Sequence, residues 1–251
     1  MRFRTKINSL LRLLTLTRRP RTAAVILAGG VGSRMQSKDH TTKQLLTLGG
    51  VPVVIRSLTA FDQSPYIDEL VLVIRKEEKE TVKALLGVYK IKKPLRLVAG
   101  GETRQLSAIS GFLAISQKAK FVAIHDAARC LVTEDMIAKV VSAAYADGAA
   151  SAAAPVHDTV KQVDKDRMVT KTLDRATLWR AGTPQVFRAD LYRAAAFTAQ
   201  KEGFEATDDN MLAERIGYAV RMVDCGEENI KLTTRTDLYI AEAILRSREE
   251  K

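Results

Sequence analysis

The 251-residue chain has few of the residues that build disulfide frameworks and zinc sites. It contains two cysteines, Cys130 and Cys225, and three histidines, and none of them pair at the spacing of a zinc site. It also has no apolar run long enough to cross a bilayer. These absences predict an ordinary globular protein of a reducing cytoplasm, with no stable membrane insertion.

Acidic residues are missing from the first 21 positions, which carry seven basic residues. These seven supply most of the formal net charge of +11 and leave +4 on the remaining chain. Because the excess is concentrated in a terminal extension, we do not expect a nucleic-acid partner. Residues 8–20 form a short basic amphipathic segment, compatible with an anionic lipid contact, a transit-like segment or a leader without function. We expect a flexible extension over residues 1–22 and a single domain over 23–251.

From Ala23 onward, short apolar runs rich in β-branched residues alternate with longer segments of helical period. This alternation is typical of an α/β protein with a mostly parallel, Rossmann-like sheet and helices on both faces. The predicted strands are 23–28, 70–75, 95–98, 120–125 and 150–156. The predicted helices are 51–63, 76–86, 103–117, 133–147 and 236–248.

One region breaks the alternation. Residues 159–163 and 168–173 flank the polar segment 164–167, a pattern that predicts a β-hairpin. A polar two-stranded hairpin is barely stable alone. The hairpin therefore needs a second surface, on its own domain or on a partner chain. We expect a protruding β-hairpin arm at about residues 157–176 that packs against the second subunit of a homodimer.

A glycine-rich turn, residues 28–34, directly follows the first predicted strand. Open α/β sheets bind ligands at this end of their strands, and glycine lets backbone N–H groups approach phosphate oxygens. The spacing fits neither the Walker loop nor the dinucleotide fingerprint. The turn alone could be a plain connection, but Arg34 and the following Lys43 add cationic charge. Together they predict a nucleoside triphosphate site.

A second strand ends in Asp126, and Arg129 follows three residues later. Mg²⁺ prefers carboxylate and phosphate oxygens, so Asp126 is a candidate metal ligand and Arg129 a candidate phosphate contact. The two residues could instead cap a turn and pair with each other. We expect His125 to pack or form hydrogen bonds in the wall of the site rather than to act as a base.

Four later segments, 172–175, 182–185, 206–209 and 229–233, each place a hydroxyl or a cation near a turn or an element end. Singly, each is explained by a turn, a helix cap or an exposed charge. In this order, and together with the glycine-rich turn and the segment 123–129, they resemble the 2-C-methyl-D-erythritol 4-phosphate cytidylyltransferase family. The resemblance covers roughly residues 23–245.

The resemblance implies transfer of CMP from CTP to an alditol phosphate, methylerythritol phosphate, with release of pyrophosphate in non-mevalonate isoprenoid biosynthesis. It implies that Arg34, Lys43 and Lys231 are the catalytic cations and that Asp126 binds Mg²⁺. The residues implied to contact the nucleotide are Ala28, Gly29, Gly30, Gly32, Gly101, Glu102 and Ser107. Those implied to line the acceptor pocket with Lys231 are Arg129, Thr159, Arg175, Thr183 and Thr207. Thr159 and Arg175 would serve the neighbouring subunit's site through the arm.

Two positions depart from the family pattern, because Thr42 and Cys130 stand where the family usually has proline. Several motifs, including 183–185, are shared with ribitol 5-phosphate cytidylyltransferase, which stays an alternative. Ser107 and Thr207 are closer to the methylerythritol enzyme, whereas the longer segment between Met35 and Lys43 favours the ribitol enzyme. A non-catalytic nucleotide-binding or basic surface-binding protein is the alternative from another class. The presence of both glycine-turn cations and Asp126 disfavours it.

Overall fold

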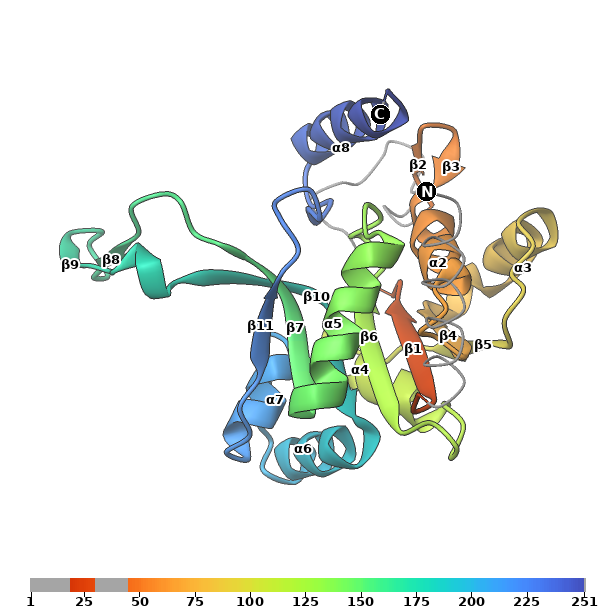
Figure 1. The fold of residues 1–251 in the computed structure, drawn as a ribbon, viewed down its shortest axis with the longest axis horizontal. Helices are drawn as coiled ribbons and strands as arrows, with labels where there is room; N and C mark the ends of the chain where they lie inside the picture. Colours follow the sequence, from red (N-terminus) through yellow and green to blue (C-terminus); the bar gives the residue numbers. More distant parts are fainter. Residues whose placement is uncertain (1–18, 30–44, 251) are drawn as a thin grey trace, which may run out of the picture.

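The computed structural model describes residues 19–29 and 45–250, so most of the basic extension and the segment 30–44 lie outside the described residues. The main sheet has seven strands in the order β11-β7-β10-β6-β1-β4-β5 (Figure 1). Their bounds are β1 Thr22–Leu27, β4 Glu69–Ile74, β5 Leu95–Ala99, β6 Phe121–Asp126, β7 Ala149–Pro155, β10 Trp179–Arg188 and β11 Arg221–Asp224. All neighbouring strands pair in parallel except at β10, which is antiparallel to both β6 and β7.

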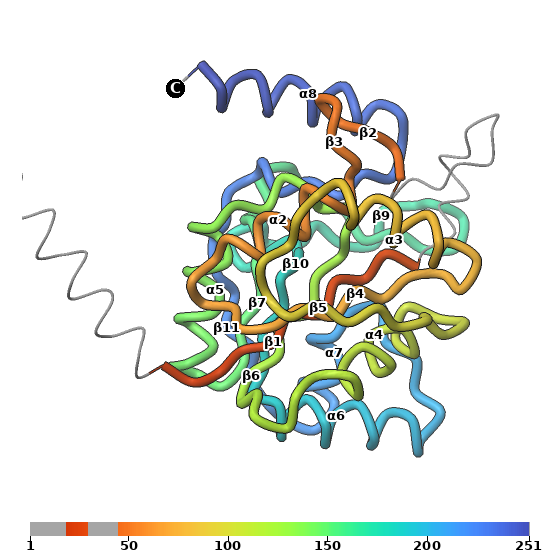
Figure 2. Tube along the Cα trace, turned by 90° about the vertical axis from the view of Figure 1, so that its right-hand side faces the viewer, coloured from red at the N-terminus to blue at the C-terminus, as the bar shows by residue number. Residues whose placement is uncertain are grey.

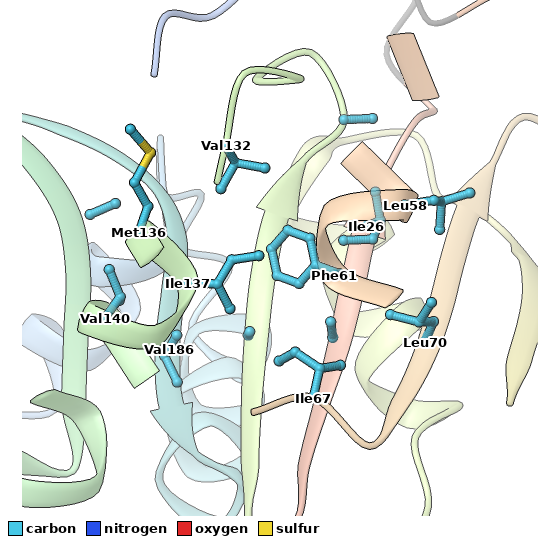
Figure 3. Packing of buried hydrophobic residues seen from close by; sticks show 14 of the residues in the cluster. Ile26, Leu58, Phe61, Ile67, Leu70, Val132, Met136, Ile137, Val140 and Val186 are labelled. Carbon is cyan, nitrogen blue, oxygen red and sulfur yellow. The ribbon is translucent and has the colours of Figure 1, made fainter. Parts of the chain in front are cut away.

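Helices cover both faces of this sheet. β1, β4 and β6 are buried along their whole length, so both of their faces must be shielded from solvent. On one face, α2, α3 and α5 pack into one apolar cluster, part of which is shown in Figure 3; on the other, α4, α6 and α7 form a second cluster (Figure 2). The helix bounds are α2 Val53–Gln63, α3 Lys79–Val88, α4 Arg104–Leu113, α5 Glu134–Asp147, α6 Ala189–Lys201, α7 Asp209–Arg215 and α8 Arg235–Glu249. Within residues 19–29 and 45–250, no helix has the length and apolarity to span a membrane.

The predicted α/β alternation is confirmed from β1 to β7, with ends that shift by a few residues. The predicted inner face of α5 is also confirmed, since Ile137, Val140 and Val141 are fully buried. β10, β11, α6 and α7 were not predicted, and residues 182–185 were expected near a turn or an element end. Residues 182–185 lie inside β10, where a register shift against β7 between Ala181 and Gln185 accommodates them.

The expected hairpin is present as β8 (Lys161–Val163) and β9 (Val169–Thr172), paired antiparallel and set apart from the main sheet (Figure 1). All residues of both strands are exposed. Val163, Met168 and Val169 expose 48%, 67% and 59% of their surface. The hairpin therefore presents apolar side chains that the protomer itself does not cover.

Gly111 marks the closest approach of α4 to the sheet. An added Cβ would overlap Val25 Cγ1 and lie 2.7 Å from Val73 Cγ2. We expect Gly111→Ala to lower the free energy of unfolding by about 1–3 kcal/mol, because this core has no room for another carbon. Urea denaturation measures the change. The control is Gly87→Ala in α3, where an added Cβ meets nothing within 4 Å; it should be neutral or stabilising. Equal losses in both variants would contradict the packing argument.

Candidate active site

The candidate site lies at the carboxyl edge of the parallel strands, where β6 ends at the centre of the sheet. Toward one side lie β1, β4 and β5, and toward the other lie β10, β7 and β11. The segments after β1 and β6 are joined by a hydrogen bond from Ala127 N–H to the Leu27 carbonyl, at 2.9 Å. Asp126, the last residue of β6, therefore lies between two halves of the edge where open α/β sheets bind ligands.

The half formed by β1, β4 and β5 carries five of the residues predicted to contact the nucleotide. Gly101 N–H donates to Ser107 Oγ at 3.1 Å, which fixes the segment after β5 against the first turn of α4. A Cβ on Gly29 would lie 3.9 Å from the same Ser107 Oγ, and a Cβ on Gly101 would lie 2.5 Å from Leu106 Cβ. The chain therefore needs glycine at position 101, and it presents Ala28 and Gly29 beside this segment. Glu102 is exposed on it.

Asp126 is held between two cations. Lys231 Nζ lies 2.7 Å from Oδ2, and Arg104 Nε lies 3.1 Å from Oδ1. Burial would raise the pKa of the Asp126 carboxyl, but Arg104 and Lys231 outweigh it and hold the pKa well below its ordinary value. Asp126 is therefore ionised, and it keeps the Lys231 ammonium at a defined place on the edge.

Thr183 and His125 form the wall behind Asp126. The Thr183 hydroxyl accepts a hydrogen bond from Asp126 N–H at 3.0 Å and lies 3.1 Å from His125 Nδ1. Burial lowers the pKa of His125 to about 3, so the ring is neutral near pH 7. His125 is fully buried against Phe61, which agrees with the expectation that it packs in the wall.

The half formed by β10, β7 and β11 holds the predicted acceptor residues Arg129 and Lys231. Arg129 donates from Nη1 to the Asn229 carbonyl at 2.8 Å and from Nη2 to the Ala181 carbonyl at 3.4 Å. These two bonds direct the guanidinium toward a cavity of about 210 Å³ that Lys231 also lines. Positive charge thus faces this half of the edge, as an anionic acceptor would require.

The other predicted residues are not gathered at Asp126. Thr159 and Arg175 are exposed on the arm, where Arg175 Nη1 donates to the His157 carbonyl at 2.7 Å. Thr207 is exposed before α7, and its hydroxyl lies 3.1 Å from Met211 Sδ. The predicted triphosphate residues Gly30, Gly32, Arg34 and Lys43 lie outside the described residues.

Arg104 and Asp209 were not among the predicted site residues. Arg104 Nη1 lies 2.7 Å from Asp209 Oδ2, so its guanidinium bridges two carboxylates, those of Asp126 and Asp209. Asp209 is only 1% exposed, and its other oxygen accepts from the Tyr192 hydroxyl at 2.7 Å. Each residue stands within two positions of a residue that the sequence analysis did name. Nothing in the sequence indicates that they meet across 105 positions.

A magnesium ion at this site would have Asp126 as its protein ligand. No group of three or more histidine, cysteine or acidic side chains that could hold a metal occurs in the described part of the chain. The ionised Asp126 carboxylate suits a Mg²⁺ ion that takes its other ligands from substrate phosphates and water, as Mg²⁺ commonly does.

The open α/β sheet, whose central strand ends in an ionised, cation-flanked aspartate beside a cationic cavity, agrees with the nucleotidyltransferase class that the sequence resembles. The family model for 2-C-methyl-D-erythritol 4-phosphate cytidylyltransferase matches residues 22–247. The chain therefore belongs to that family.

Relatives and solved structures agree with this assignment. The chain is 41% identical over 225 residues to 2-C-methyl-D-erythritol 4-phosphate cytidylyltransferase of Caldanaerobacter subterraneus, covering 89% of this chain and 98% of that protein. It is 42% identical to the same enzyme of Shouchella clausii, covering 90% and 97%. Among solved structures, 4-diphosphocytidyl-2C-methyl-D-erythritol synthase of Anaerococcus prevotii superposes with a TM-score of 0.81 at 30% identity, covering 90% of this chain and 99% of that one.

Proposed function

We propose that the protein transfers CMP from CTP to 2-C-methyl-D-erythritol 4-phosphate and releases pyrophosphate, as a step of non-mevalonate isoprenoid biosynthesis. Family membership over residues 22–247 carries this proposal, because the match spans both halves of the site edge. The position of Asp126 and Lys231 between those halves supports it further. A nucleotide on one side and an acceptor on the other would meet at this pair.

On the nucleotide side, we assign the cytidine to Ala28, Gly29, Gly101, Glu102 and Ser107. We assign the triphosphate to the glycine-rich turn, with Gly30, Gly32, Arg34 and Lys43. On the acceptor side, we assign Arg129, Thr183, Thr207 and Lys231 from the same protomer. These assignments follow the family resemblance. The proximity of Gly29, Gly101 and Ser107, and that of Arg129 and Lys231, supports them.

The chemistry needs positioning and charge rather than a base. A phosphate oxygen of the acceptor attacks the α-phosphorus of CTP in line, and the bond from that phosphorus to the bridging oxygen of pyrophosphate breaks. The nucleophile is already an anion, so no proton has to be removed, which agrees with a neutral, buried His125. The Lys231 ammonium, fixed by Asp126, offsets charge that builds on the phosphoryl oxygens. Mg²⁺ held by Asp126 and the triphosphate would supply further charge compensation.

We propose a homodimer formed through the arm. Exposed Val163, Met168 and Val169 give β8 and β9 apolar surface that a second subunit would bury. Thr159 and Arg175, exposed at the base of the arm, would then enter the neighbouring site. Sedimentation equilibrium should give twice the monomer mass, and mixing inactive Arg175→Ala and Lys231→Ala chains should restore part of the activity. A monomeric mass would contradict the dimer.

We also propose a reducing cytoplasm as the compartment. Cys130 and Cys225 are buried free thiols, and burial raises the pKa of each to about 11, so both stay protonated. A titration of free thiols, with and without denaturant, would show whether either cysteine is oxidised after purification under air.

The proposed function is tested by measuring pyrophosphate release from CTP and Mg²⁺ with two acceptors in parallel. We expect turnover with methylerythritol phosphate. Turnover with ribitol 5-phosphate alone would assign the protein to that competing activity instead. CTP binding without turnover on either acceptor would favour the non-catalytic alternative. Omitting the acceptor controls for simple CTP hydrolysis.

A further inference from the structure

The cavity on the acceptor side has an unusual wall. We call it the Ala152 cavity, a space of about 210 Å³ bounded by Ala152–Ala154 of β7, residues 180–182 of β10, the loop after β11 and Arg129. Small residues keep it open. At Gly182, an added Cβ would lie 3.3 Å from the Ala152 carbonyl oxygen and 3.5 Å from Arg129 Cζ. A side chain at position 182 would therefore narrow the space next to the Arg129 guanidinium.

Charged groups stand around this small-residue wall. Lys231 lines the cavity and also bonds Asp126, so the cavity continues directly from the reaction centre. An ion pair, Arg180 Nη2 to Glu227 Oε1 at 2.9 Å, forms another part of its lining. Both side chains of the pair are 60% exposed, and therefore neither is locked in place by packing. Glu227 is the only carboxylate that lines the cavity within the described residues.

We propose that the Ala152 cavity receives the carbon chain of the acceptor and that the Arg180–Glu227 pair determines specificity by binding its hydroxyl groups. The inference rests on the proposed function, which places the acceptor phosphate at Lys231 and Asp126. From there the carbon chain extends into the cavity. Alanine methyl groups and Gly182 suit a methyl-branched carbon chain. Adjacent hydroxyls need both donors and acceptors, which a guanidinium beside a carboxylate provides.

Arg180→Gln and Glu227→Gln test the proposal in steady-state kinetics with methylerythritol phosphate and CTP. We expect each to raise KM for the alditol phosphate about tenfold, while KM for CTP stays within twofold. The matched control is Arg221→Gln on the edge strand β11, which removes an exposed ion pair of similar length, 2.8 Å to Asp147. It should change neither KM. Equal melting temperatures would exclude a folding defect.

A purely structural ion pair is distinguished by exchanging the two residues. The double variant Arg180→Glu with Glu227→Arg keeps an ion pair but inverts its donors and acceptors. We expect its acceptor KM to stay raised; a return to the wild-type value would overturn the proposal. Unchanged acceptor KM in both single variants, or an equal rise in KM for CTP, would also overturn it. Absence of wild-type turnover with this acceptor would instead refute the proposed function, so the two failures are separable.

Discussion

Replacing Lys231 with alanine is expected to lower kcat by about 10²–10³-fold, the usual cost of removing one group that stabilises transition-state charge. The ammonium lies 2.7 Å from Asp126, at the point where the two halves of the edge meet. Its removal leaves Asp126 paired with Arg104, so the fold should persist. Rapid-quench measurement of CMP transfer at saturating CTP and acceptor measures the chemical step.

Two further variants sharpen this prediction. Lys139→Ala on α5 removes another lysine from an ion pair of nearly the same length, 2.8 Å to Asp135, on an exposed helix surface. It should keep full activity. Lys231→Arg keeps the charge but replaces a compact ammonium with a planar guanidinium, and we expect only partial recovery. If Lys231→Ala retained more than a tenth of wild-type kcat, Lys231 would not compensate charge in the transition state.

The hydrophobic pattern of the sequence was sufficient to predict those strands and helices whose own residues carry a strong pattern. β1, β4 and β6 are continuous apolar runs, and α5 repeats apolar residues at helical spacing, so each was predictable alone. β10 was not, because Gly182, Thr183 and Pro184 are turn residues that the register shift against β7 admits into a strand. α6 buries Leu191, Tyr192 and three alanines on one face, so its helical periodicity was present in the sequence and was overlooked.

The candidate site was predictable only one residue at a time. Asp126 and Lys231 each stood at a turn or strand end, and the family resemblance joined them. The bridge from Arg104 to Asp209 depends on how α4 and α7 pack on the same face of the sheet. No local pattern encodes that packing. The Arg180–Glu227 pair likewise forms because β10 lies beside β7, and β7 beside β11.

Replacing Arg104 with glutamine is expected to lower the free energy of unfolding by about 3 kcal/mol, because it leaves Asp209, 1% exposed, without its ion-pair partner. Activity should fall as well, since Asp126 loses one of the two groups that orient it. Arg104→Lys keeps the charge, but an ammonium cannot bridge both carboxylates as the planar guanidinium does. The stability of this variant should lie between those of wild type and Arg104→Gln. Urea denaturation at pH 7 measures the difference.

The effect of Arg104→Gln should also depend on pH. Burial would raise the pKa of Asp126, but Arg104 and then Lys231 lower it below its usual 3.8. Such a carboxylate stabilises the fold above its unfolded pKa, and this contribution is lost as the pH falls through the folded pKa. Without Arg104 the folded pKa rises and the contribution shrinks. The stability gap between wild type and variant should therefore be complete at pH 7 and narrow below about pH 4.

Arg188→Gln, which removes an exposed pair with Asp190, should leave stability unchanged at both pH values. A gap that did not narrow at any acid pH would show that Arg104 does not stabilise the fold through its carboxylate partners.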